Sequence, residues 1–96
     1  MTAEYTSGDT VPLTGSINQA ATGASIVVHV KAPSGLLTQP GTFTDEATGA
    51  FSMDWPAGGV PVVDRAQNVA METETTFSNG DSRTLHGSIR LLPQLA

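Results

Sequence analysis

Cysteine is absent from this chain of 96 residues, which excludes disulfide bridges and thiolate metal sites. Basic side chains are scarce, because four Lys and Arg stand against nine Asp and Glu, and the formal net charge is −5. Nucleic acids and anionic membranes are bound through clusters of Lys and Arg, so this charge argues against both as partners. The length suits one domain with a single core.

Long apolar runs and helical patterns are also missing. Ile26-Val27-Val28 is typical of the apolar runs and is far shorter than the roughly 20 residues that cross a bilayer. Residues 1–10 have neither the basic segment nor the apolar stretch of a secretory signal, so we expect a protein made in the cytoplasm. No window of about a dozen residues places apolar side chains at the i, i+3, i+4 and i+7 spacing of a helix.

What the sequence does contain is a period of two, which is typical of half-buried strands. Within residues 25–31, Ile26, Val28 and Val30 share one face, and Pro33-Ser34-Gly35 ends the segment. Residues 50–55 repeat this pattern, with apolar side chains on one face at Phe51, Met53 and Trp55. Weaker strands are predicted at residues 10–17 and 36–44, and a loop is predicted at residues 58–66.

The dipeptide Asn79-Gly80 predicts a β-hairpin, because both residues tolerate positive φ. A two-residue loop would set each apolar face of the hairpin against a polar one. A three-residue loop of Asn79-Gly80-Asp81 aligns the faces instead. The pairs that it predicts are Thr75 with Leu85, Met71 with Ile89, Val69 with Leu91, Glu74 with His86, Ala70 with Arg90 and Phe77 with Arg83.

About five to seven short strands between turns predict an all-β chain with an immunoglobulin-like antiparallel β-sandwich. We expect a single domain over residues 1–96, with a flexible arm at 1–10 and a flexible tail at 93–96. Trp55 has the size to anchor its core. A small β-barrel is the competing architecture.

Two groups of residues have donor atoms for a metal ion, and neither has the spacing of a known site. The candidate zinc ligands are His29, His86, Glu74 and Asp54, and the candidate calcium ligands are Asp45, Glu46 and Thr48. No GxSxG elbow of a serine hydrolase occurs. We therefore expect no metal, no cofactor and no enzymatic activity, and an apolar patch at Val27, Leu36 and Leu37 would suit docking.

Four stretches, in this order, carry a resemblance to a known family: GDTVPLTGSI, GASIVVHVKAPSG, DEATGAFSMDW and METETTFSNGDSRTL, the last followed by SIRLLP. Together they resemble the small immunoglobulin-like domain of tailed-bacteriophage virions, typified by the amino-terminal domain of baseplate upper proteins. The likeness covers residues 5–93. The chain departs from the family at residues 65–69, where a longer Pro-Val loop precedes the Glu-x-Glu strand.

The resemblance implies a non-enzymatic structural protein of the virion, present in multiple copies and bound to other phage structural proteins. The short chain favours a capsid decoration or head accessory protein, and the alternative is a tail or baseplate adaptor that binds tail or baseplate proteins. A carbohydrate-binding module is a more distant alternative. We expect partner contacts from residues 1–10, 57–68 and 92–96, with Tyr5, Val60, Val62, Arg65, Leu92 and Leu95 as the candidate residues.

Overall fold

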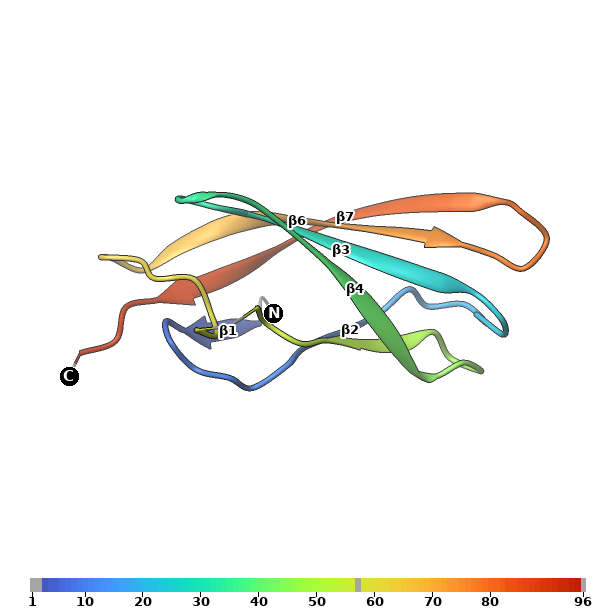
Figure 1. The fold of residues 1–96 in the computed structure, drawn as a ribbon, viewed down its shortest axis with the longest axis horizontal. Helices are drawn as coiled ribbons and strands as arrows, with labels where there is room; N and C mark the ends of the chain where they lie inside the picture. The colour runs from blue at the N-terminus through green and yellow to red at the C-terminus, as the bar shows by residue number, and fades with distance from the viewer. Residues whose placement is uncertain (1–2, 57, 96) are drawn as a thin grey trace.

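The computed structural model describes residues 3–56 and 58–95 and shows an all-β chain, as predicted (Figure 1). Its strands are β1 (Glu4–Thr6), β2 (Leu13–Ser16), β3 (Ser25–Ala32), β4 (Gly35–Asp45), β5 (Ala50–Met53), β6 (Gln67–Thr76) and β7 (Ser82–Leu92). The predicted strand at residues 10–17 is shorter in the structure, and the predicted loop at residues 58–66 contains no strand. The described ranges contain no helix with the length and apolar character to cross a membrane.

The strands form one mixed, curled sheet in the order β1-β7-β6-β3-β4-β5-β2. All neighbours are antiparallel except β1 and β7, which run parallel with Glu4 beside Arg90. Strand β4 serves both parts of the sheet, because residues 35–41 pair with β3 and residues 42–45 pair with β5. In Figure 1, β4 accordingly crosses diagonally from the layer of β3, β6 and β7 to the layer that holds β2.

The core is built from the alternating residues of the strands. Ile26, Val28 and Val30 are at most 2% exposed, which confirms the predicted inner face of β3. Trp55 is 9% exposed and lies edge-on against Tyr5, with 5.6 Å between the ring centroids. Its indole N–H donates to the Val11 carbonyl at 2.9 Å, which satisfies the one polar group that the buried ring brings into the core.

The β6–β7 hairpin has a three-residue loop, but the predicted position of this loop is wrong by one residue. The Phe77 N–H donates to the Asp81 carbonyl at 2.8 Å and the Gly80 N–H donates to the Phe77 carbonyl at 2.9 Å. The loop is therefore Ser78-Asn79-Gly80, with Gly80 last and at φ 92°. A type I turn followed by a left-handed residue requires this order, whereas the prediction placed the glycine in the middle.

The predicted cross-strand pairs are wrong for the same reason, because each partner on β7 shifts by two residues. A shift of two residues leaves every side chain on its predicted face. The observed pairs are Val69 with Ile89, Met71 with Gly87, Thr73 with Leu85, Thr75 with Arg83, Glu72 with His86, Glu74 with Thr84 and Asn68 with Arg90.

Candidate contact surface

Three segments that are far apart in the sequence meet around Ser7, which is 3% exposed. The Ser7 N–H donates to the Leu92 carbonyl at 2.8 Å. The Ser7 Oγ accepts a hydrogen bond from the Val63 N–H at 3.0 Å and lies 2.9 Å from the Leu92 carbonyl and 3.1 Å from the Pro61 carbonyl. A hydroxyl has one proton, so it donates to one of these two carbonyls at a time. We call Ser7, Pro61, Val63 and Leu92 the Ser7 junction.

Backbone hydrogen bonds hold the β5–β6 loop against the segment that follows β1. The Gly8 N–H donates to the Val60 carbonyl, and the Val60 N–H donates to the Asp9 carbonyl, both at 2.9 Å. Gly59 has φ 81°, and a Cβ at this position would collide with the carbonyl oxygen of Asp9. Only glycine permits this close approach, so Gly59 is a structural requirement of the loop.

The surface around the junction exposes apolar side chains. Val62 is 80% exposed and Leu95 is 97% exposed, although Val62 lies between the junction residues Pro61 and Val63. Arg65 is also exposed on the same loop. Figure 1 shows this loop and the carboxyl-terminal tail at the same end of the molecule. We call Val62, Arg65 and Leu95 the contact end.

The structure places the six candidate contact residues in three different environments. Val62, Arg65 and Leu95 are exposed, whereas Tyr5 and Leu92 are half-buried. The Tyr5 hydroxyl accepts a hydrogen bond from the Thr14 N–H at 3.2 Å. Val60 is 1% exposed and belongs to the core, so its side chain is not available to a partner in the folded domain. The sequence did not predict the burial of Val60, because this loop has no alternation of apolar and polar residues.

Ser7 is the residue that sequence reasoning missed. It stands in the polar stretch Thr-Ser-Gly-Asp-Thr, where nothing distinguishes a buried serine from a solvated one. Its role depends on residues 54 and 85 positions further along the chain, at Pro61 and Leu92. No local pattern contains such information.

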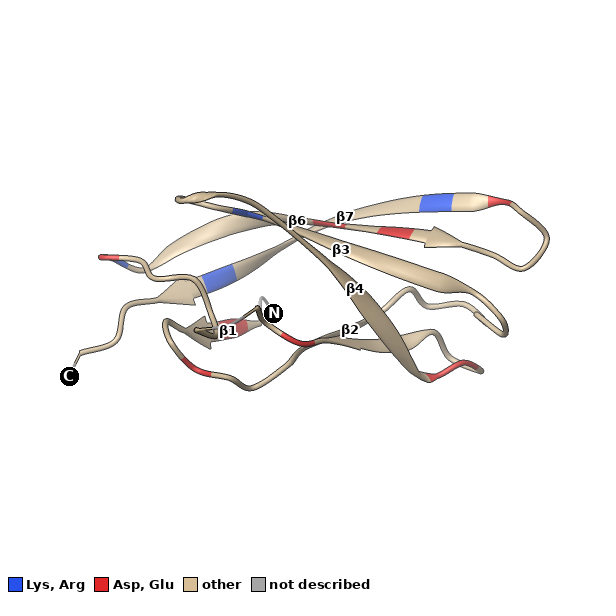
Figure 2. Ribbon diagram, in the orientation of Figure 1, with Lys and Arg blue, Asp and Glu red and all other residues tan. Residues whose placement is uncertain are grey.

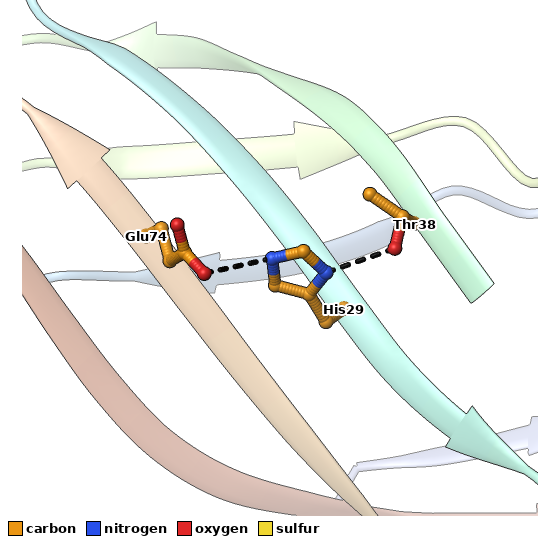
Figure 3. Close-up of polar contacts among 3 residues, drawn as sticks. All are labelled: His29, Thr38 and Glu74. Atoms are coloured by element: carbon orange, nitrogen blue, oxygen red, sulfur yellow. Dashed lines mark hydrogen bonds and ion pairs between the residues drawn. The ribbon is translucent and has the colours of Figure 1, made fainter. Parts of the chain in front are cut away.

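A second polar cluster lies on the outer face of the sheet, on the central strands (Figure 3). The His29 Nδ1 lies 2.9 Å from the Thr38 Oγ1, and the His29 Nε2 lies 3.1 Å from a carboxylate oxygen of Glu74. The predicted contact of Glu74 with His86 is wrong, because the register shift sets Glu72 opposite His86. The Glu74 side chain is 56% exposed, so its pair with His29 contributes little stability.

Two of the candidate calcium ligands accept hydrogen bonds through their carboxylates within the fold. An Asp45 carboxylate oxygen accepts the Ala47 N–H at 3.1 Å, and a Glu46 carboxylate oxygen accepts the Gly23 N–H at 2.9 Å. Within residues 3–56 and 58–95, no three His, Asp or Glu side chains lie close enough together to hold a metal ion. No protein family, curated protein or solved structure matches this chain.

Proposed function

We propose that this protein is a non-enzymatic structural protein of bacteriophage virions, a capsid decoration or head accessory protein that binds its neighbours through the contact end. One observation carries the proposal. The arm, the loop and the tail, each expected from the sequence to bind a partner, meet around Ser7. Val62 and Leu95 expose apolar surface there, which a neighbouring subunit would remove from water.

We also propose that the curled sheet is a variant of the immunoglobulin-like sandwich. That sandwich joins its second, fifth and fourth strands in one sheet and its third, sixth and seventh strands in the other. The pairings β2–β5, β4–β5, β3–β6 and β6–β7 follow this scheme. The chain differs in that β4 also pairs with β3 and β1 pairs with β7, so that the two layers are continuous.

A virion supplies the setting in which a small contact surface is sufficient. Each copy on a symmetric shell contributes a modest area, and simultaneous engagement of many copies or many sites multiplies the effect. The carbohydrate-binding alternative has less support, since such a module stacks sugars on exposed aromatic rings. Here Phe51 and Trp55 are 3% and 9% exposed and face the core.

The proposal is tested with phage particles assembled without this chain, incubated with the purified protein and imaged by electron cryomicroscopy. We expect regular density on the capsomers, with the contact end against the shell. Density at the tail alone would move the assignment to an adaptor. Absence of density on both head and tail would contradict the proposal.

Matched variants locate the binding surface. Val62→Asp and Leu95→Asp each place a charge on the contact end and are expected to abolish the density. Leu36→Asp is the comparison, because Leu36 is 68% exposed, lies on the outer face of β4 opposite Lys31 of β3, and belongs to the apolar patch predicted from the sequence. Loss of binding in Leu36→Asp, with binding retained in the other two variants, would show that the contact end is not the surface used.

A further inference from the structure

Strand β7 is paired along one side and largely open on the other. Residues 82–91 pair with β6, whereas β1 pairs only with residues 90–92. In the described part of the chain, no strand lies beside residues 82–86 on the β1 side of the sheet. An open edge of this kind is a template for another strand.

The backbone groups of this edge point outward. In an antiparallel ladder, alternate residues direct their N–H and C=O groups toward the same neighbour. The Arg90 N–H donates to the Ala3 carbonyl at 2.9 Å, on the β1 side. Ser82, Thr84 and His86 have the same parity as Arg90, so their N–H and C=O groups face the open side.

A slot of about 360 Å³ with a mixed apolar and polar lining lies beside residues 85–87 of the open edge, between β7 and β2. Its apolar lining includes Phe51, Met71 and Leu85, and two glycines, Gly15 and Gly87, face it from opposite strands. Gly15 is required by Phe51, because a Cβ would approach the aromatic ring to 2.8 Å. Gly87 has no such requirement, because a Cβ would lie 3.7 Å from the Met71 methyl group, an ordinary contact. A side chain at position 87 would therefore fit beside Met71, and glycine at this position leaves the slot open.

Strand β1 shows what kind of segment this edge accepts. It runs parallel to β7, and its Glu4 carboxylate lies 3.5 Å from the Arg90 guanidinium. Its next residue, Tyr5, turns inward and packs against Trp55. Strand β1, which occupies one end of this edge, thus has an acidic side chain on the outer face followed by an aromatic one on the inner face.

The charge of β7 favours the same chemistry over the rest of the edge. The strand contains Arg83 and Arg90 and no Asp or Glu (Figure 2). On the paired side, Glu72 of β6 lies opposite His86 and Glu74 lies opposite Thr84, so Arg83 is the one cationic side chain of residues 82–86. Exposed charges interact strongly only within about 8 Å at physiological ionic strength, so side chains at the edge act on a bound strand more than the net charge does.

We propose that the open edge of β7 binds an extended, acidic segment of another protein as an added strand. The segment runs parallel to β7 in line with β1, and its alternate apolar side chains enter the slot. This surface differs from the contact end, and the inference does not depend on the proposed function.

A synthetic peptide that alternates valine and glutamate over about six residues is the probe, since this is a usual strand length. Amide chemical shifts of the whole protein are followed during titration. We expect changes at Ser82, Thr84 and His86 and an affinity at least about tenfold above that of the matched valine–lysine peptide. Equal affinity for both peptides, or shift changes confined to other strands, would overturn the proposal.

Variants separate binding from folding. Gly87→Val fills the slot and suits a strand, so the melting temperature is retained or raised while peptide affinity falls at least about tenfold. His86→Pro removes an N–H that faces the open edge and none that pairs with β6, so it is expected to weaken peptide binding. Arg83→Glu is expected to weaken binding, and Lys31→Glu, the same charge change at an exposed position of β3, is its control. Unchanged affinity in Gly87→Val, or a dimer that occupies the edge and excludes the peptide, would contradict the proposal.

Discussion

The two ends of the domain are held together in different ways. At the Ser7 junction, irregular segments are fixed by hydrogen bonds to a buried serine hydroxyl. At the opposite end, the β6–β7 hairpin and the segment before β3 meet through exposed groups, as in the contact of Arg83 with the Gln19 side chain. Buried hydrogen bonds are costly to leave unmade, whereas exposed ones are exchanged for bonds to water. Stability should therefore depend far more on the junction end.

The largest effect is expected from the buried aromatic residue that packs against Tyr5. Trp55→Ala removes a 9%-exposed ring and its hydrogen bond to Val11, so the free energy of unfolding should fall by about 3–5 kcal/mol. Phe77→Ala, at the half-buried base of the hairpin loop, is the matched control and should cost less than half as much. Urea denaturation measures both, and a Trp55→Ala variant as stable as the parent would contradict the core assignment.

Two glycines with similar φ angles, one at each end of the domain, allow a direct comparison of the two ends. Gly59 has φ 81° and Gly80 has φ 92°, so alanine at either position pays about 1–2 kcal/mol for its conformation. A Cβ at Gly80 meets nothing within 4 Å, whereas one at Gly59 collides with the Asp9 carbonyl. Gly59→Ala should cost about 1–3 kcal/mol more than Gly80→Ala for this overpacking. Equal melting temperatures of the two variants would show that the β5–β6 loop moves away from the added Cβ at little cost in stability.

Removal of the junction hydroxyl should have an intermediate effect. Ser7→Ala leaves the buried Val63 N–H without its acceptor, at a cost of about 1–3 kcal/mol. Hydrogen exchange at the Val63 amide should accelerate together with the loss of stability. Ser78→Ala in the exposed hairpin loop is the control and should change stability by less than about 0.5 kcal/mol. Unaltered hydrogen exchange at the Val63 amide in Ser7→Ala would show that the Ser7 hydroxyl does not stabilise this junction.

The smallest effect is expected at the hairpin end. Arg83→Gln breaks an exposed contact with Gln19, so the free energy of unfolding should change by less than about 0.5 kcal/mol. Thermal unfolding of the variant beside the parent measures this difference. A decrease in the free energy of unfolding of more than about 1 kcal/mol would mean that polar contacts stabilise the two ends to a similar extent.

Sequence reasoning succeeded where the signal is local. The alternation of Ile26, Val28 and Val30 follows from the pleat of a strand, and it predicted the buried face of β3. The hairpin at Gly80 was also predicted, together with its loop length. Its register was not, because it depends on which loop position the glycine occupies, and both choices leave the apolar faces aligned.

The other missing parts of the prediction are long-range. The pairing of β1 with β7 joins the two ends of the chain, and no pattern within either strand specifies it. The division of β4 between two neighbours likewise depends on where β3 and β5 lie. For the contact end, the sequence indicated which segments are irregular, but the buried Val60 and Ser7 could be identified only from the packing.

The parallel arrangement of β1 and β7 has a mechanical consequence. A force that draws the start of β1 away from the end of β7 acts along both strands, because Glu4–Thr6 lies beside residues 90–92 in the same direction. The hydrogen bonds between the strands then carry the load together, in shear. A force that lifts the tip of the β6–β7 hairpin away from β3 would instead open the ladder between β6 and β3 one bond at a time. The domain should therefore resist stretching between its terminal strands better than peeling of its hairpin.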